Sequence, residues 1–163
     1  MNHDEWAAGQ EEMTVSVDGH KLSVAYRDEG EAGSEPPVVF LHGIPTWSFL
    51  WGEVVPSIAD EHRTIAPDLV GYGNSAMHDG FDRSIRAQEA MLDDLLSQLG
   101  IESVSLVSHD IGGGVALRYA AHNPEKVEKL VCSNAVCYDS WPVEFITDFG
   151  LPDTAETPID ELE

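Results

Sequence analysis

An aspartate stands where an apolar segment gives way to small residues, at Asp110 in Ser108-His109-Asp110-Ile111-Gly112-Gly113-Gly114. An apolar strand-like run precedes it and a helix-like segment follows. This is the context of a nucleophile elbow, with Asp in the position that Ser usually holds. Ser108 and Gly112, two residues before and after, are small enough for the strained backbone of such a turn. A carboxylate at the start of a helix is stabilised as an anion and can attack carbon to form an ester. The alternative is that Asp110 only caps the helix, because Asp is a favoured N-cap residue.

A second turn offers candidate backbone donors, in His42-Gly43-Ile44-Pro45-Thr46-Trp47. In an elbow enzyme the oxyanion hole takes one N–H from the residue after the nucleophile and one from such a loop. Those donors are here the N–H groups of Ile111 and Ile44. The alternative is a turn rich in Gly and Pro that has no catalytic role, since the same residues fit it equally well. The residues expected to support the two turns are His42, Gly43, Pro45, Ser108, His109 and Gly112. We expect His42 to order the loop rather than act as a base, and His109 to point away from Asp110 into the scaffold.

The elements that must position these turns alternate between strands and helices. The sequence predicts a β-hairpin around Asp18-Gly19. It predicts further strands at Val38–Leu41, Thr64–Ala66, Val104–Val107 and Val127–Val131, and helices at Trp47–Ala59, Ser84–Leu99 and Ile111–His122. Such alternation is typical of an α/β fold, a mostly parallel sheet with helices on both faces. Ligands of these sheets bind beyond the carboxyl ends of the strands, where both turns fall.

On these motifs the chain resembles the α/β-hydrolase superfamily, in the branch with an Asp nucleophile: haloalkane dehalogenases and epoxide hydrolases. The shared residues are His42-Gly43-Ile44-Pro45-Thr46-Trp47-Ser48-Phe49-Leu50-Trp51, Ala66-Pro67-Asp68-Leu69-Val70-Gly71-Tyr72-Gly73-Asn74-Ser75 and His109-Asp110-Ile111-Gly112-Gly113. The resemblance runs from about Val15 to Pro142 and implies the N-terminal part of an α/β-hydrolase fold. We therefore expect an N-terminal tail at 1–12 and the N-terminal part of the core at 13–141. Residues 142–163 are expected to begin a cap segment, and their acidic, Pro-interrupted sequence predicts no regular structure.

Several positions depart from the family pattern. Haloalkane dehalogenases usually hold the leaving halide with a Trp directly after the nucleophile, and often with an Asn in the first loop. This chain has Ile111 and Ile44 at those positions. Asn134 stands where some dehalogenases carry the catalytic acid. No residue matches the family's catalytic His, so the chain resembles a member truncated before that residue. Trp47 and Trp141 are candidates for the pocket wall.

The chain is strongly acidic, with 8 Lys and Arg against 30 Asp and Glu and a formal charge of −22. The acids are dispersed, and a dispersed charge of this size is a device of halophiles, so we expect adaptation to high salt. The basic residues are too few to neutralise phosphates, which argues against a nucleic-acid partner.

Location and cofactors are also constrained by the sequence. No apolar segment is long enough to span a bilayer and no signal peptide is evident, so we expect a cytoplasmic protein without a membrane partner. Cys132 and Cys137 are expected to be free thiols, with Cys132 in a buried strand. The 7 histidines show no metal-ligand spacing, and we expect neither a metal nor another cofactor.

The resemblance implies a hydrolase whose Asp110 forms a covalent ester with a small, apolar electrophile such as an alkyl halide. Two alternatives remain open at this point. One is an epoxide hydrolase, and the other is an inactive truncated chain without turnover. The sequence gives no indication of the oligomeric state.

Overall fold

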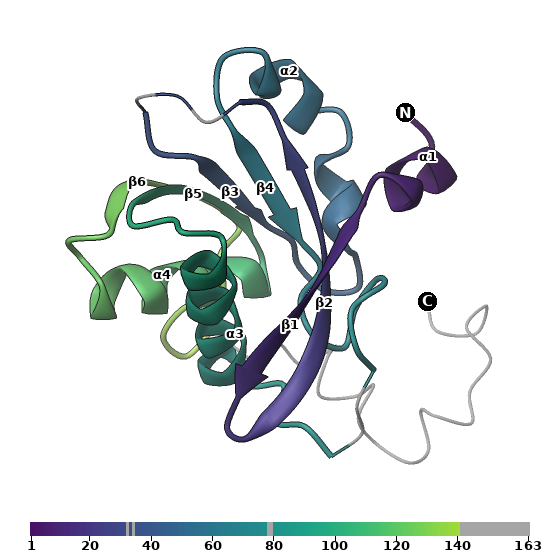
Figure 1. Ribbon diagram of the computed structural model, residues 1–163. Coiled ribbons are helices and arrows are strands. Elements are labelled where there is room, and N and C mark those ends of the chain that lie inside the picture. Colours follow the sequence, from purple (N-terminus) through teal and green to yellow (C-terminus); the bar gives the residue numbers. More distant parts are fainter. Residues whose placement is uncertain (32, 34, 78–79, 141–163) are drawn as a thin grey trace.

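A sheet of six strands forms the centre of the computed structural model, which describes residues 1–31, 33, 35–77 and 80–140 (Figure 1). The strands are β1 (Glu11–Val17), β2 (His20–Glu29), β3 (Val38–Leu41), β4 (Thr64–Pro67), β5 (Val104–His109) and β6 (Val127–Ser133). Their order across the sheet is β1-β2-β4-β3-β5-β6. The pairs β4–β3, β3–β5 and β5–β6 are parallel, whereas β1–β2 and β2–β4 are antiparallel.

The hairpin between β1 and β2 turns where the sequence predicts it. Asp18 and Gly19 both have positive φ, at 49° and 81°, and Val17 pairs with His20. Two consecutive residues of positive φ are the requirement of the tight turn that matches the twist of two paired strands. The Asp-Gly dipeptide therefore sets the register of the antiparallel edge of the sheet.

Helices cover both faces of the sheet. Successive residues of a strand point to opposite faces, so each strand contributes side chains to both layers. Val39 and Leu41 of β3 join the larger apolar core, which α3 (Ile85–Gln98) and α4 (Ile111–His122) cover. Phe40, between them, joins a second core on the other face with Trp6 and Val55. The helices of that face are α1 (His3–Ala8), a 3-10 helix η1 (Ser48–Trp51) and α2 (Val55–Ala59). The predicted α/β architecture is thus confirmed.

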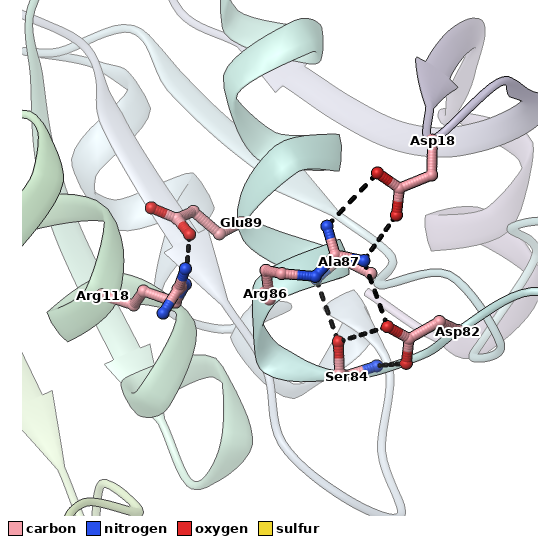
Figure 2. Close-up of polar contacts among 7 residues, drawn as sticks. All are labelled: Asp18, Asp82, Ser84, Arg86, Ala87, Glu89 and Arg118. Atoms are coloured by element: carbon pink, nitrogen blue, oxygen red, sulfur yellow. Dashed lines mark hydrogen bonds and ion pairs between the residues drawn. The ribbon is translucent and has the colours of Figure 1, made fainter.

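Polar contacts fix α3 against its neighbours (Figure 2). The Ser84 hydroxyl caps the helix by accepting a hydrogen bond from the N–H of Ala87, and it donates to Asp82. Arg86 bridges Asp82 to Asp18 in the β1–β2 turn. On another side of α3, the buried carboxylate of Glu89 pairs with Arg118 and His122 of α4. These contacts join the hairpin, α3 and α4 into one scaffold.

One predicted helix, Trp47–Ala59, is wrong as a continuous element. It divides into η1 and α2, with a turn at residues 52–54 between them. Pro56 lies in the first turn of α2, where a missing N–H costs nothing. Inside a longer helix the same Pro would remove a hydrogen bond and clash with the preceding turn.

Residues 1–12 were expected to form a tail, but they contain α1 and the start of β1. Asn2 and Glu5 form a reciprocal capping box at the start of α1. Trp6 is fully buried against the sheet, which fixes the short helix in place. The expected boundaries between tail, core and cap are otherwise not tested by the structure, and residues 142–163 lie outside the described residues.

The expectation of a buried β6 is wrong as well. β6 pairs only with β5 within the described residues, and all of its residues after Val127 are exposed. Cys132 is exposed on this strand and Cys137 is exposed after it. Its apolar sequence resembles that of a central strand, yet side chains on both of its faces are exposed within the described residues. No helix of the described residues is long and apolar enough to cross a membrane.

Candidate active site

Asp110 lies at the sharp turn between β5 and α4, with φ 52° and ψ −122°. A positive φ is rare for a residue with a Cβ and marks a strained backbone. The side chain makes no capping hydrogen bond to α4. Its Oδ1 instead accepts a hydrogen bond of 2.8 Å from the N–H of Ile44, 66 positions away in the chain. The interpretation of Asp110 as a simple helix cap therefore fails.

The small residues around this turn are required by close backbone approaches. A Cβ on Gly112 would lie 2.4 Å from the carbonyl oxygen of His42, and one on Gly113 would lie 2.3 Å from the Cβ of Ala135. A Cβ on Gly43 would lie 2.4 Å from the Cβ of Asp110. Both turns are thus pressed together at the carboxyl ends of β3 and β5, and any larger side chain would separate them.

The loop after β3 is held by His42, which is fully buried. Its Nε2 accepts a 2.9 Å hydrogen bond from the N–H of Leu69, and its Nδ1 lies 3.1 Å from the carbonyl oxygen of Gly43. Burial holds the pKa of His42 below its usual value, which favours the neutral ring that can make both contacts. Thr46 closes the loop by donating to the same Gly43 oxygen, and the Ile44–Pro45 peptide is cis.

The second predicted donor, the N–H of Ile111, belongs to the first residue of α4. An N–H in the first turn of a helix has no partner within the helix, so it can serve an external anion. Ser108 lies two residues before Asp110, is buried, and donates its hydroxyl to the carbonyl oxygen of Val131. The structure therefore brings both predicted turns to one place.

An open hollow of about 450 Å³ surrounds Asp110; it is lined by Ile44, His109, Asp110, Asn134, Ala135, Val136 and Ser140. Nδ1 of His109 lies 3.0 Å from the carbonyl oxygen of Ser133, to which it can only donate, so His109 contacts the scaffold and also borders the hollow. A larger hollow of about 580 Å³ lies beside α4, between Arg118 and Tyr138, but it contains neither Asp110 nor Ile44. The candidate site is therefore the smaller hollow.

The two tryptophans proposed for the pocket wall have different outcomes. Trp47 is not among the described residues that line the hollow around Asp110. It packs against His3 of α1 and against Phe49, with ring centroids 5.7 and 5.8 Å apart. Trp141 lies outside the described residues. Trp47 thus belongs to the aromatic layer that joins α1 to η1.

Sequence reasoning assigned no role to Asp68, although it lies within one of the shared motifs. The structure buries it completely at the end of β4, and its carboxylate accepts hydrogen bonds from Ser48, Gln10 and Asn74. An acidic residue directly after a buried strand was the available signal, because a buried carboxylate needs several donors. No group of His, Cys, Asp or Glu suited to a metal ion occurs in the described parts of the chain.

A strained elbow, two converging turns and a parallel sheet with helices on both faces define the architecture of an α/β hydrolase. The family model described as alpha/beta hydrolase fold matches residues 36–155, and the chain belongs to this family.

The curated relatives include enzymes of different activities. A cis-3-alkyl-4-alkyloxetan-2-one decarboxylase of Shewanella oneidensis is 35% identical over 148 residues, which cover 89% of this chain and 42% of that protein. Haloalkane dehalogenase 2 of Mycobacterium tuberculosis is 29% identical over 127 residues, covering 78% of this chain and 42% of that protein.

The solved structures similar to this chain also include enzymes of different activities. A haloalkane dehalogenase from Bradyrhizobium elkani has 36% identity and a TM-score of 0.68, over 78% of this chain and 42% of that one. A thermophilic esterase from Thermogutta terrifontis has 26% identity and a TM-score of 0.72, over 82% of this chain and 48% of that one. The chain thus spans less than half the length of each of these four proteins.

Proposed function

We propose that Asp110 is a nucleophile that forms a covalent ester with a small, apolar electrophile such as an alkyl halide. The observation that carries this proposal is the contact between Asp110 and Ile44. Oδ1 accepts the Ile44 N–H at 2.8 Å, while no donor of the described residues bonds Oδ2. One oxygen is therefore held in place, and the other is available to attack.

The reaction follows from this arrangement. Oδ2 attacks the carbon that carries the halogen, the carbon–halogen bond breaks, and the halide leaves with the electron pair. Release of product then requires water to attack Cγ of Asp110, which places negative charge on Oδ1 until the Cγ–Oδ2 bond breaks and the alcohol leaves with Oδ2. The N–H groups of Ile44 and Ile111 are donors suited to that charge, since fixed backbone dipoles stabilise an oxyanion without reorganisation.

No histidine of the described residues hydrogen-bonds Asp110. Both ring nitrogens of His42 are occupied by Leu69 and Gly43, and Nδ1 of His109 contacts the carbonyl oxygen of Ser133. We therefore expect this chain to complete the alkylation step and to accumulate the ester. The epoxide alternative also needs an acid that protonates the ring oxygen, and it is tested with the same assay.

A second candidate substrate is a four-membered lactone ring. The relative described as an oxetanone decarboxylase matches 89% of this chain at 35% identity. Attack of Asp110 on the saturated ring carbon bonded to the ring oxygen would break that carbon–oxygen bond, leaving an ester on Asp110 and a free carboxylate on the opened ring. The mass change separates the candidates, because the whole lactone is retained whereas an alkyl halide loses its halide.

Intact-mass analysis with peptide mapping tests the proposal. The 163-residue chain, first shown to be folded by circular dichroism, is incubated separately with a 1-haloalkane, a terminal epoxide and a cis-3,4-dialkyl-oxetan-2-one. We expect one adduct on Asp110 for at least one electrophile. Cys132 and Cys137 are exposed and also react with such reagents. An ester is removed by mild alkali, whereas a thioether is retained, so the two products are distinguished.

Two variants serve as controls for this experiment. Asp110→Asn removes the nucleophilic oxygen and should abolish the alkali-sensitive adduct, because a neutral amide is a poor nucleophile. Asp139→Asn changes an exposed carboxylate next to Ser140 of the same hollow and should leave the adduct unchanged. A folded protein with no adduct on Asp110 for any of the three reagents contradicts the proposal and favours an inactive chain. Steady hydrolysis of the haloalkane or of the epoxide would show that the chain contains a base we have not identified.

A further inference from the structure

We propose that Asp68 and Gln10 are positioning residues for the Ile44 N–H, so that the N-terminal segment before β1 is part of the active-site scaffold. Neither residue contacts the hollow around Asp110. They act on the loop that carries Ile44, and their role rests on the function proposed above.

Adjacent residues at the end of β4 hold both ends of the loop. The N–H of Leu69 donates to Nε2 of His42 at 2.9 Å, two residues before Ile44. The carboxylate of Asp68 accepts the N–H of Ser48 at 2.9 Å, four residues after Ile44. Because both restraints come from one dipeptide, any movement of it moves the whole loop. The Ile44 N–H between them reaches Oδ1 of Asp110 at 2.8 Å.

Asp68 can hold Ser48 only because other donors fix its own orientation. Its Oδ2 accepts from the side-chain amide of Gln10 at 2.9 Å and from the N–H of Asn74 at 2.8 Å. The site has no spare room, since a Cβ on Gly73 would lie 2.3 Å from Oδ2. A fully buried carboxylate with three donors from three separate segments is a fixed point of the structure.

Gln10 joins this fixed point to the N-terminal segment. Its Nε2 also lies 3.2 Å from the hydroxyl oxygen of Ser48, and its Oε1 accepts from the side chain of Asn74. Trp6 of α1 donates its indole N–H to the same Ser48 hydroxyl at 2.9 Å. Ser48 is therefore held through its backbone by Asp68 and through its side chain by Trp6 of α1 and by Gln10.

The test compares two glutamines that each join separate segments. Gln10→Ala removes the donor to Asp68 and Ser48. Gln98→Ala is the matched control. Gln98 is the last residue of α3, and its side-chain amide donates to the carbonyl oxygen of Thr14 and to the carboxylate of Asp94. The readout is hydrogen exchange of the Ile44 amide by NMR, which does not depend on activity. Val24, inside the β1–β2 pair, reports global opening.

We expect Ile44 exchange to be about tenfold faster in Gln10→Ala, the factor expected when one hydrogen bond is weakened, with Val24 unchanged. Gln98→Ala should leave Ile44 as in the parent chain. Asp68→Asn should have the larger effect, since its amide presents a donor to groups that already donate. If Asp68→Asn does not fold, Gln10→Ala decides alone, because Gln10 is only half-buried.

The rate of ester formation on Asp110 is measured on the same variants. A slower rate in Gln10→Ala with unchanged melting temperature supports positioning. If the parent chain forms no ester, the proposed function fails, while the Ile44 exchange still tests the scaffold. If the ester forms and Ile44 exchange in Gln10→Ala equals that of the parent, the inference is overturned. A fall in melting temperature with no change at Ile44 likewise overturns it, since it shows a role in stability alone.

Discussion

Gly43 and Asp110 come from two turns that are distant in the chain, yet their backbones lie so close that one of the residues must lack a side chain. A Cβ at position 43 would lie 2.4 Å from Cβ and 2.7 Å from Oδ1 of Asp110. That oxygen is the one bound by Ile44. The hydrogen bond at the centre of the site therefore depends on the absence of atoms at Gly43 as much as on the presence of a donor.

We expect Gly43→Ala to displace the Asp110 carboxylate and to destabilise the chain by about 1–3 kcal/mol, the usual cost of overpacking. Ester formation on Asp110 should slow by about a hundredfold, since a displacement of about 1 Å has effects of that size on reactivity. Urea denaturation and the adduct assay measure the two effects. Gly33→Ala is the matched control, because no heavy atom lies within 4 Å of a Cβ there. Unchanged adduct formation in Gly43→Ala would refute this view of the site.

At the scale of single residues, the sequence identifies only those candidate site residues that belong to a local motif. Asp110 and Ile44 are identified because small residues and apolar runs flank each of them within a few positions. The contact of Gln10 with Asp68 joins residues 58 positions apart. Neither Gln10 nor its neighbours form a motif, and only the folded sheet brings them together. A positioning role of this kind leaves no local signal in a single sequence.

Among the helices, those with a local sequence signal were predicted, whereas those that depend on contacts with distant residues were missed. The helix predicted at Ile111–His122 has those bounds in the structure, and α3 lies within one residue of its predicted range at each end. α3 carries clear helical periodicity, whereas α4 is indicated by the elbow context that precedes it. The interruption between η1 and α2 and the helical start of the chain were missed. α1 is short, and its stability depends on the burial of Trp6 rather than on its own periodicity.

The start of α3 offers a test of stability at the scale of one element. The Ser84 hydroxyl accepts from the N–H of Ala87 and donates to Asp82, as Figure 2 shows. Ser84→Ala should lower the free energy of unfolding by about 1 kcal/mol, the usual effect of losing an N-cap. Ser97→Ala, an exposed serine near the end of the same helix, controls for the change of residue type and should be neutral. Equal effects of both changes on urea denaturation would exclude a specific cap.

At the scale of the whole molecule, charge is the dominant feature. With a formal charge of −22, the acidic side chains repel one another and destabilise the compact state. Local ion pairs oppose this only weakly, because solvent and salt screen exposed pairs such as Arg86 with Asp18. Added salt weakens those pairs and the general repulsion together. Since the acids greatly outnumber the bases, relief of the repulsion should be the larger effect.

We therefore expect the melting temperature to rise between low salt and molar potassium chloride. The Debye length falls from about 10 Å at 0.1 M to about 3 Å at 1 M, so that most pairs of surface carboxylates no longer interact. A gain of 1 kcal/mol corresponds to about 2–4 °C for a chain of this size. Glycine betaine at matched osmolality controls for effects other than screening, because it carries no net charge. A melting temperature that is flat or falling in potassium chloride would contradict the expectation. An equal rise in betaine would assign the effect to solvent exclusion rather than to charge.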